Sequence, residues 1–407
     1  MKNRVALIRC PAYDLALVED AVREAIALLG GISAYVRPGQ RVLLKPNMVR
    51  GVDPDRAVST HPTIVAAVAK LVIEAGGHPL IVESPGGPYS PALLRTAYRR
   101  TGMTWAAEVS GAELNFDCEG VQVSNPQGQV LHRLDVVRPL LEADLVINLP
   151  KLKTHNLTGL TLAVKNLFGL VPGALKIGYH AKLQQRERFC QGLLDILLFV
   201  KPALHIMDAV VAMEGEGPSG GDPRKLGAII AGADALAVDL VCAALVGFEA
   251  DEVLTTKLAI ERGLTSGDIA DLELLGEPLE TLRVDDFRRG VEAAVDPGLL
   301  PRVLRRLIPN GSPEDNGQGD ARGRIPFRAI SSGWLWRQLV AYPYAGDGCT
   351  GCGFCARHCP VQAIKVIEGR AHMDTKACIR CYCCHELCPE TAVKLHKPLL
   401  GRVLMGS

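Results

Sequence analysis

The sequence predicts an α/β fold, a mainly parallel sheet with helices on both faces, followed by a small α+β domain at the C-terminus. Strand and helix signals alternate through the first 250 residues, as they do where each helix connects two parallel strands. Eight of the thirteen cysteines then lie near the C-terminus in two copies of one spacing. The chain has 407 residues, 48% hydrophobic and 22% charged, so we expect one large domain with a substantial core and a small appendage.

The alternating elements can be followed along the sequence. Apolar runs bounded by turn residues predict strands over residues 1–9, 41–44, 79–82, 144–149, 204–207 and 227–231. Helical spacing and capping residues predict helices over residues 15–29, from Thr60 as cap to residue 76, over residues 90–100, and from Asp234 to residue 247. The first run contains arginines and lacks a cleavage pattern, so we interpret it as a strand and not as a signal peptide.

The cysteine spacing is typical of an electron-transfer domain. Cys349, Cys352, Cys355 and Cys359-Pro360 are followed 29 residues later by Cys378, Cys381, Cys384 and Cys388-Pro389. In the bacterial ferredoxin arrangement three cysteines bind one 4Fe–4S cluster and the fourth crosses to the other cluster. We therefore predict a first cluster held by Cys349, Cys352, Cys355 and Cys388, and a second held by Cys378, Cys381, Cys384 and Cys359. Zinc is the competing interpretation, but three cysteines in tandem before Cys-Pro, twice, favour iron and sulfide.

Each Cys-Pro pair is followed by a matching apolar stretch, residues 363–366 and 392–395, which predicts a strand that pairs one half of the repeat with the other. Residues 346–396 thus resemble a complete two-cluster ferredoxin domain. Cys383 is an additional thiol beside Cys384, and we interpret it as a buried or spare cysteine because using it as a ligand would spoil the repeated spacing. So small a domain depends on its clusters to fold.

Composition sets the domain boundaries that we expect. Residues 1–308 form the α/β main domain, residues 309–345 a linker and docking segment rich in Gly, Pro, Asp and Asn at its start, residues 346–396 the ferredoxin domain, and residues 397–407 a tail. Trp334, Trp336, Tyr342 and Tyr344 precede the first cluster cysteine. We expect these aromatic residues to pack the ferredoxin domain onto the main domain, with a direct part in electron transfer as the alternative.

Charge and hydropathy exclude several classes of partner. The formal net charge is +1, which gives no field that would favour nucleic acid or a membrane surface. The longest apolar stretch, residues 193–207, contains Asp195, Lys201 and His205 and is too short and polar to span a bilayer. Thiolate clusters without an export signal indicate a reducing cytoplasm.

Polar residues follow the predicted strands one after another. They are Lys45 and Asn47, Glu83 and Ser84, Lys151 with Lys153 and His155, and Asp208. The crevice beyond the carboxyl ends of parallel strands is where open sheets bind ligands, so the set indicates a site at one edge of the sheet. Each residue alone would more often be a solvated charge.

The richest segment runs from Leu149 to Gly169. Lys151, Lys153 and His155 lie on one side if the backbone stays extended, and Lys165-Asn166 follows on an otherwise apolar element. Three ammonium groups suit a carboxylate or phosphate ligand. His155 is the best proton donor or acceptor, or else a histidine held by a backbone carbonyl.

Residues 214–222 form a glycine-rich loop containing Gly215 and Gly217, which is either a lid over the crevice or a plain connection. It is neither a Walker sequence nor a dinucleotide-binding motif. These motifs together, in the order Lys45-Pro46-Asn47, Thr60-His61-Pro62-Thr63, Glu83-Ser84, Pro150 to His155, Lys165 to Gly169, and Asp208 with residues 215–218, resemble the domain of unknown function 362 family. The resemblance implies an iron–sulfur protein of anaerobic or photosynthetic metabolism without an assigned activity.

These observations give one hypothesis and two alternatives. We expect an iron–sulfur oxidoreductase whose two 4Fe–4S clusters relay electrons from a redox partner protein to a small anionic substrate or cofactor. Lys151, Lys153 and Lys165 would clamp the anion and His155 would transfer a proton; Lys45, Asn47, His61, Glu83, Ser84, Asn166, Asp208, Gly215 and Gly217 would complete the site. The alternatives are a non-enzymatic electron-delivery or cluster-handling partner of a larger complex, and a non-redox enzyme that uses a metal at His61 and His155 beside structural clusters.

Overall fold

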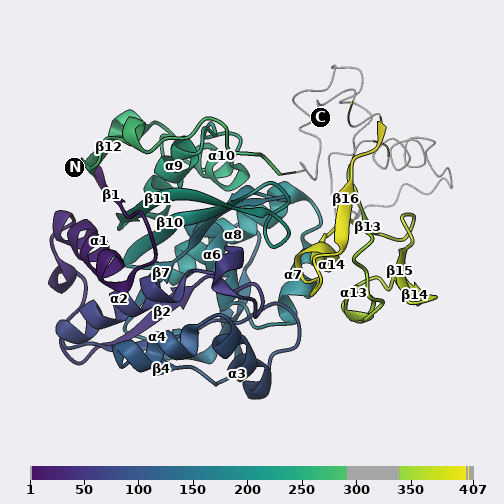
Figure 1. The fold of residues 1–407 in the computed structure, drawn as a ribbon, viewed down its shortest axis with the longest axis horizontal. Coiled ribbons are helices and arrows are strands. Elements are labelled where there is room, and N and C mark those ends of the chain that lie inside the picture. The colour runs from purple at the N-terminus through teal and green to yellow at the C-terminus, as the bar shows by residue number, and fades with distance from the viewer. Residues whose placement is uncertain (1, 291–337, 339, 400–401, 403–407) are drawn as a thin grey trace.

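The computed structural model describes residues 2–290, 338, 340–399 and 402. Its centre is a ten-stranded sheet with the order β12-β1-β11-β10-β7-β2-β3-β4, to which β8 is added beside β10 and β9 beside β8 (Figure 1). The strands are β1 Asn3–Arg9, β2 Arg41–Pro46, β3 His78–Ile81, β4 Glu113–Leu114, β7 Leu145–Leu149, β8 Lys151–His155, β9 Gly159–Thr161, β10 Leu204–Glu214, β11 Asp222–Gly232 and β12 Leu272–Gly276.

Most neighbouring strands in this sheet are parallel, as the sequence predicts. From β10 through β7, β2 and β3 to β4 every pairing is parallel, and β12 runs parallel to β1. The exceptions are β11, which is antiparallel to both β1 and β10, and β9, which is antiparallel to β8. The α/β class is therefore confirmed, with the hairpins β10–β11 and β8–β9 added to the parallel strands.

Helices cover both faces of the sheet, and the strands alternate their side chains between two cores. In β1, Val5 and Leu7 enter one core while Ala6 and Ile8 enter the other, as the two-residue period of a strand requires. The second core is closed by α1 Leu15–Leu28, α2 Pro62–Glu74, α3 Pro91–Arg100 and α4 Met103–Ser110. The first is closed by α5 Arg138–Glu142, α6 Ala163–Asn166, α7 Leu175–Lys182, α8 Arg186–Val200, α9 Ala235–Leu245 and α10 Leu254–Glu261.

Shorter elements complete the main domain. β5 Gly120–Ser124 and β6 Arg133–Val137 form a separate antiparallel pair. Single turns of 3-10 helix occur at Ile32–Ala34, Pro54–Arg56, Leu167–Leu170, Ile269–Asp271 and Leu279–Thr281. In the part of the chain that the structure describes, no helix is long and apolar enough to cross a membrane.

Two sequence predictions about this domain are wrong in detail. The cap of α2 is His61, whose Nδ1 accepts from the Thr63 N–H, while the Thr60 hydroxyl is used to bond the backbones of Leu149 and Asn47. The strand predicted to end before Asp208 continues to Glu214. A buried lysine neutralises the Asp208 carboxylate, so the strand accommodates this charge in its middle.

The C-terminal domain repeats one unit with the period of its cysteines. α13 Phe354–Arg357 and α14 Cys383–Glu386 are equivalent, and each follows a residue with a left-handed backbone, Gly353 at φ 71° and Tyr382 at φ 57°. The two apolar stretches form β14 Ile364–Ile367 and β16 Val393–His396 as expected. They do not pair with each other: β14 pairs with β15 Arg370–Met373, and β16 pairs with β13 Tyr342–Ala345.

The ferredoxin half is seated on the main domain by polar and apolar contacts. Tyr382, Ala341 and Leu395 belong to the first core of the main domain, and Lys394 Nζ donates to Glu216 Oε2 of the main domain at 2.6 Å. Of the aromatic residues expected to dock it, Tyr342 packs against His396 and Tyr344 is exposed. Trp334 and Trp336, with most of the predicted linker and the end of the tail, lie outside the described residues.

Candidate functional site

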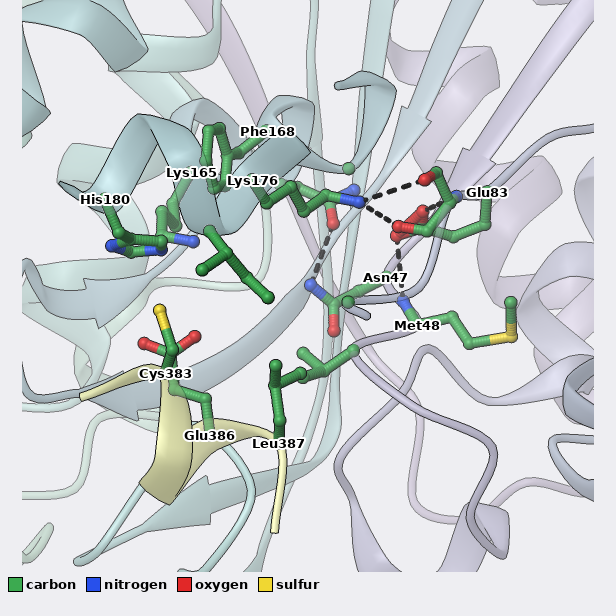
Figure 2. A pocket seen from close by; sticks show the side chains of 16 residues that line it. Asn47, Met48, Glu83, Lys165, Phe168, Lys176, His180, Cys383, Glu386 and Leu387 are labelled. Carbon is green, nitrogen blue, oxygen red and sulfur yellow. Dashed lines mark hydrogen bonds between the residues drawn. The ribbon is translucent and has the colours of Figure 1, made fainter. Parts of the chain in front are cut away.

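A pocket of about 70 Å³ lies where the ends of the sheet strands meet α14 (Figure 2). At roughly 10–15 Å³ for each water, it has room for about five waters or one small molecule. The main domain contributes Asn47, Met48, Val49, Glu83, Ser84, Gly86, Lys165, Asn166, Phe168, Gly169, Lys176, Ile177 and His180, and the ferredoxin domain contributes Cys383, Glu386 and Leu387.

One wall rests on a buried ion pair between adjacent parallel strands. Lys45, at the end of β2, places its Nζ 3.0 Å from Glu83 Oε1 after β3, and both side chains are buried. Glu83 also accepts from the N–H groups of Met48 and Ser84. Burial lowers the pKa of Lys45, and the nearby Glu83 carboxylate opposes that shift. Glu83 is thereby fixed in the pocket wall, with Lys45 behind it.

A chain of amides forms the back of the pocket. The Asn47 Nδ2 donates to Asn166 Oδ1 at 2.9 Å, and Asn166 donates in turn to Asn148 Oδ1. Lys153 Nζ donates to Asn47 Oδ1 at 2.8 Å and to the Val58 carbonyl at 2.6 Å. The Lys153 ammonium thus lies behind Asn47 and does not line the pocket, and burial lowers its pKa well below the usual range.

Three basic side chains face the pocket itself. Lys165 Nζ lies 5.0 Å above the Phe168 ring and 5.7 Å from that of Phe189, and no ion pair to it is found within the described residues. Lys176 donates to the carbonyl and hydroxyl oxygens of Ser84. His180 stacks on Phe189 with ring centroids 4.5 Å apart. Aromatic walls and backbone oxygens thus hold these bases without neutralising them.

Burial governs how these bases titrate. It lowers the pKa of Lys176 to about 7 and that of His180 to about 4. Burial also lowers the pKa of Lys165, which the charges of Glu386 and Glu83 partly offset. At neutral pH His180 is therefore a neutral imidazole, and Lys176 can gain or lose a proton.

His155 reaches the pocket through a residue of α14. Its Nδ1 accepts from the Leu157 N–H at 3.1 Å, and its Nε2 lies 3.3 Å from Glu386 Oε1 and has no other polar partner in the described residues. Burial lowers the pKa of His155 to about 4 against the raising effect of Glu386. Burial alone would raise the pKa of Glu386, but His155, His180 and Lys165 outweigh it, so Glu386 is a carboxylate.

Three of the predicted site residues form a separate buried cluster. Asp208 accepts from Lys151 Nζ at 2.9 Å, from the Tyr13 hydroxyl at 2.7 Å and from the His61 N–H at 2.8 Å. Tyr13 stacks on His61 with centroids 3.6 Å apart. Lys151, Asp208 and His61 are thus fully engaged with one another, and none of them lines the pocket. Within the described residues, the polar partners of His61 and those of His155 are different groups.

The glycine-rich loop also serves another contact. Thr154 Oγ1 donates to the Gly215 carbonyl at 2.8 Å and accepts from the Gly217 N–H. Further along the loop, Ser219 Oγ donates to the Glu386 carbonyl at 2.8 Å. The loop therefore supports α14 and does not cover the pocket.

Sequence reasoning found part of the pocket. Five predicted residues line it: Asn47, Glu83, Ser84, Lys165 and Asn166. Three others, Lys45, Lys153 and His155, contact lining residues without lining the pocket themselves. It missed Lys176, His180, Phe168, Cys383 and Glu386. Lys176 and His180 stand four residues apart in α7, on one helical face, and that spacing could have singled them out.

The cysteines lie in the two groups that the predicted clusters require. Cys359, Cys378, Cys381 and Cys384, the four ligands expected for the second cluster, line one cavity with apolar walls. For the first cluster, the charges of Cys388, Cys352 and Cys349 act together with burial to raise the pKa of Cys355, so these thiols are neighbours. No three His, Cys, Asp or Glu side chains in the described part stand close enough for a single metal ion.

Backbone donors reinforce this arrangement. The N–H of Ala363 donates to Cys359 Sγ at 3.2 Å, and the N–H of Ala392 donates to Cys388 Sγ at 3.3 Å. These pairs are equivalent in the repeat, and N–H donors to cysteine sulfur are among the features that tune iron–sulfur potentials. The donor set therefore fits two iron–sulfur clusters.

Comparisons with known proteins agree with the two parts of the chain. Residues 42–244 match the family model described as domain of unknown function DUF362, and residues 344–389 match the 4Fe-4S dicluster domain. A thylakoid-associated protein of Synechocystis sp. is 36% identical over 309 residues, which are 75% of this chain and 93% of that protein. One component of an ion-translocating oxidoreductase complex of Methanosarcina acetivorans is 42% identical over 48 residues, 12% of this chain and 18% of that protein.

Two solved structures are distantly similar to this chain. The lactate racemase apoprotein of Thermoanaerobacterium thermosaccharolyticum has 14% identity and a TM-score of 0.35, with 58% of this chain and 55% of that chain covered. A structural-genomics target protein of Thermotoga maritima has 14% identity and a TM-score of 0.34, with 65% and 60% covered.

Proposed function

Because this chain belongs to the family described as domain of unknown function DUF362 and carries a 4Fe-4S dicluster domain, we propose that it is a cytoplasmic iron–sulfur oxidoreductase. The clusters would supply electrons, received from a redox partner protein, to a small anionic substrate or cofactor in the pocket. The reaction would be reduction of a polarised double bond or of a bound cofactor.

One observation carries this proposal. The pocket has the basic residues Lys165, Lys176 and His180 on one side and α14 on the other, and α14 contains Cys384 and precedes Cys388. A ligand in this pocket would therefore touch the helix that carries Cys384, a predicted ligand of the second cluster, and that leads to Cys388, a predicted ligand of the first. An adjacent donor and acceptor are what electron transfer between protein and substrate requires.

The residues of the pocket suit the chemistry. When bound, iron–sulfur clusters supply one-electron transfer. Lys165 would stabilise negative charge on the substrate, since its own charge is held by aromatic rings and not by a carboxylate at bonding distance. Lys176, with its pKa lowered to about 7 by burial, would be the proton donor near neutral pH. Asn47 and Ser84 would orient the ligand.

The test is binding to anaerobically purified protein whose iron and sulfide content has been measured. We expect oxalate or inorganic phosphate to bind in calorimetry, and the double variant Lys165→Gln/Lys176→Gln to weaken binding at least about tenfold, or 1.4 kcal/mol. Lys182→Gln, an exposed lysine at the end of the same helix, is the matched control and should bind like the parent. Equal affinity in all three proteins would reject the pocket as an anion site.

A second candidate function rests on a different observation. Cys352 is exposed. In addition, 48 residues of this chain are similar to a protein that is described as a component of an ion-translocating oxidoreductase complex. The chain could thus deliver electrons to a larger complex, with no substrate of its own. Reduction of a partner protein without turnover of any small molecule would favour this function over the first.

A further inference from the structure

The pocket and the cavity of the second cluster share a wall. The cavity is lined by Cys359, Cys378, Cys381 and Cys384, and the pocket by residues of both domains. Within the described residues Cys383 is the one side chain that borders both. It is buried, and it precedes the cluster cysteine Cys384 directly in the chain. Cys383 therefore lies at the boundary between the two hollows.

An independent observation points to a ligand at the same end of the pocket. His180 is 5% exposed, and no hydrogen bond of its ring nitrogens is found in the part of the chain that the structure describes. Figure 2 shows His180 and Lys165 on the side of the pocket that faces Cys383 and Glu386, opposite Glu83 and Met48. The ring nitrogens are not fully enclosed by protein, so they open on the pocket, where a ligand or a water completes their hydrogen bonds.

The two predicted clusters differ in their surroundings. Cys352 of the first set is exposed, whereas Cys383, the neighbour of Cys384 in the second set, lies in the pocket against the main domain. The first set has its own contact with the main domain, because Arg50 donates to the carbonyl oxygens of Cys388 at 2.7 Å and Pro389 at 2.8 Å. Arg50 is thus a cationic neighbour of the first set, and Lys165 lines the pocket together with Cys383, which adjoins the second set.

We propose that Cys383 is a positioning residue that couples the pocket to the second cluster alone, so that electrons enter at the first cluster and leave from the second. This inference rests on the proposed function. The exit of electrons from the second cluster follows from the wall that its cavity shares with the pocket. Their entry at the first cluster follows from the exposure of Cys352. The ligand it implies places its negatively charged, electron-accepting group at the end formed by Cys383, His180 and Lys165.

The first test uses potentials of the resting protein and needs no ligand. A positive charge favours the reduced form of a nearby cluster, so removing it lowers the reduction potential. Lys165→Gln should lower the potential of the second cluster, and Arg50→Gln that of the first, each by up to about 59 mV, a tenfold change for a one-electron couple. The signals are assigned by electron paramagnetic resonance with Cys352→Ser and Cys381→Ser, each of which changes or abolishes one of them.

The second test uses oxalate as the probe. Saturating oxalate should lower the potential of the second cluster and leave the first unchanged. Cys383→Ala opens the wall and should enlarge that shift, whereas Cys383→Leu fills the shared space and should abolish it. A general loss of packing would change the oxalate-induced potential shift in the same direction in both variants, whereas coupling through Cys383 changes it in opposite directions. If the leucine variant does not fold, the larger shift expected for the alanine variant is the test.

The outcomes are separable from those of the proposed function. If both clusters respond equally to Lys165→Gln, or only the first responds, the inference is overturned whether or not oxalate binds. If oxalate does not bind but Lys165 and Arg50 act on different clusters, the coupling stands and the anionic ligand class fails.

Discussion

His155 on β8 and Glu386 on α14 face each other across the junction of the two domains, with Nε2 3.3 Å from Oε1. His155 is a neutral ring at pH 7, because burial lowers its pKa to about 4, and Glu386 is a carboxylate. Glu386 is the only acidic side chain that α14 contributes to the pocket. It is held by His155, which belongs to the segment from Leu149 to Gly169. The pairing places a negative charge opposite the pocket bases.

Removing that charge should strengthen anion binding. Glu386→Gln keeps the size of the side chain but removes the negative charge that competes with an anionic ligand for Lys165 and His180. We expect oxalate affinity to rise about three- to tenfold, or roughly 0.7–1.4 kcal/mol, in calorimetry. Lys165→Gln should change it in the opposite direction. A fall in affinity for both variants would mean that the substitutions act on the fold and not on the field of the pocket.

Lys151 should be a residue of stability and not of ligand binding. Lys151→Met leaves the Asp208 carboxylate buried without its cation, and breaking such a pair costs about 3–5 kcal/mol. We expect this loss in the free energy of unfolding measured with urea, with unchanged oxalate affinity in the folded protein. Lys151→Met/Asp208→Leu, which removes both charges, should recover most of it. A stable single variant that no longer binds oxalate would return Lys151 to the binding site.

The close approach of the two domains should depend on a glycine. A Cβ on Gly86, in the loop after β3, would collide with the end of the Leu387 side chain beyond α14. Gly86→Ala should therefore loosen the seat of the ferredoxin domain by about 1 kcal/mol, the low end for overpacking, because the leucine can turn aside. Limited proteolysis near residue 340 would report it. Leu387→Ala in the same chain should restore resistance, and Gly178→Ala, where a Cβ meets no atom, should have no effect.

Buried histidines should make the main domain sensitive to mild acid. Burial lowers the pKa of His205 to about 3, and its Nδ1 lies 3.0 Å from Asn148 Nδ2. The pKa of this histidine in the unfolded chain is near 6.5. Between pH 6.5 and pH 3 the unfolded chain therefore binds a proton that the folded protein does not, so the free energy of unfolding falls as pH falls. From pH 7.5 to 5.5 His205 should account for about 1.4 kcal/mol of lost stability. His205→Gln should remove that share of the change in the free energy of unfolding between pH 7.5 and 5.5, measured with urea. An unchanged pH dependence would contradict the prediction.

The local patterns of the chain were sufficient for the cofactor domain. A spacing of 29 residues predicts which cysteines lie together, and Cys359 is found lining the cavity of Cys378, Cys381 and Cys384. The reason is physical: such ligands are fixed by short loops whose geometry the intervening residues dictate. The same holds for the strands of the main domain, whose apolar periodicity determines which face each residue takes.

The sequence by itself determined the α/β class, the two groups of cluster cysteines and five polar residues that line the pocket, three after strands and two in α6. Only the tertiary structure decided that Lys151 is neutralised by Asp208 while Lys165 is left to aromatic rings, since both are lysines in apolar surroundings until distant segments meet. It also decided that Cys383 and Glu386 line the pocket. Their neighbours come from chain segments more than 200 residues away, and no local pattern encodes which charges a folded chain brings within bonding distance.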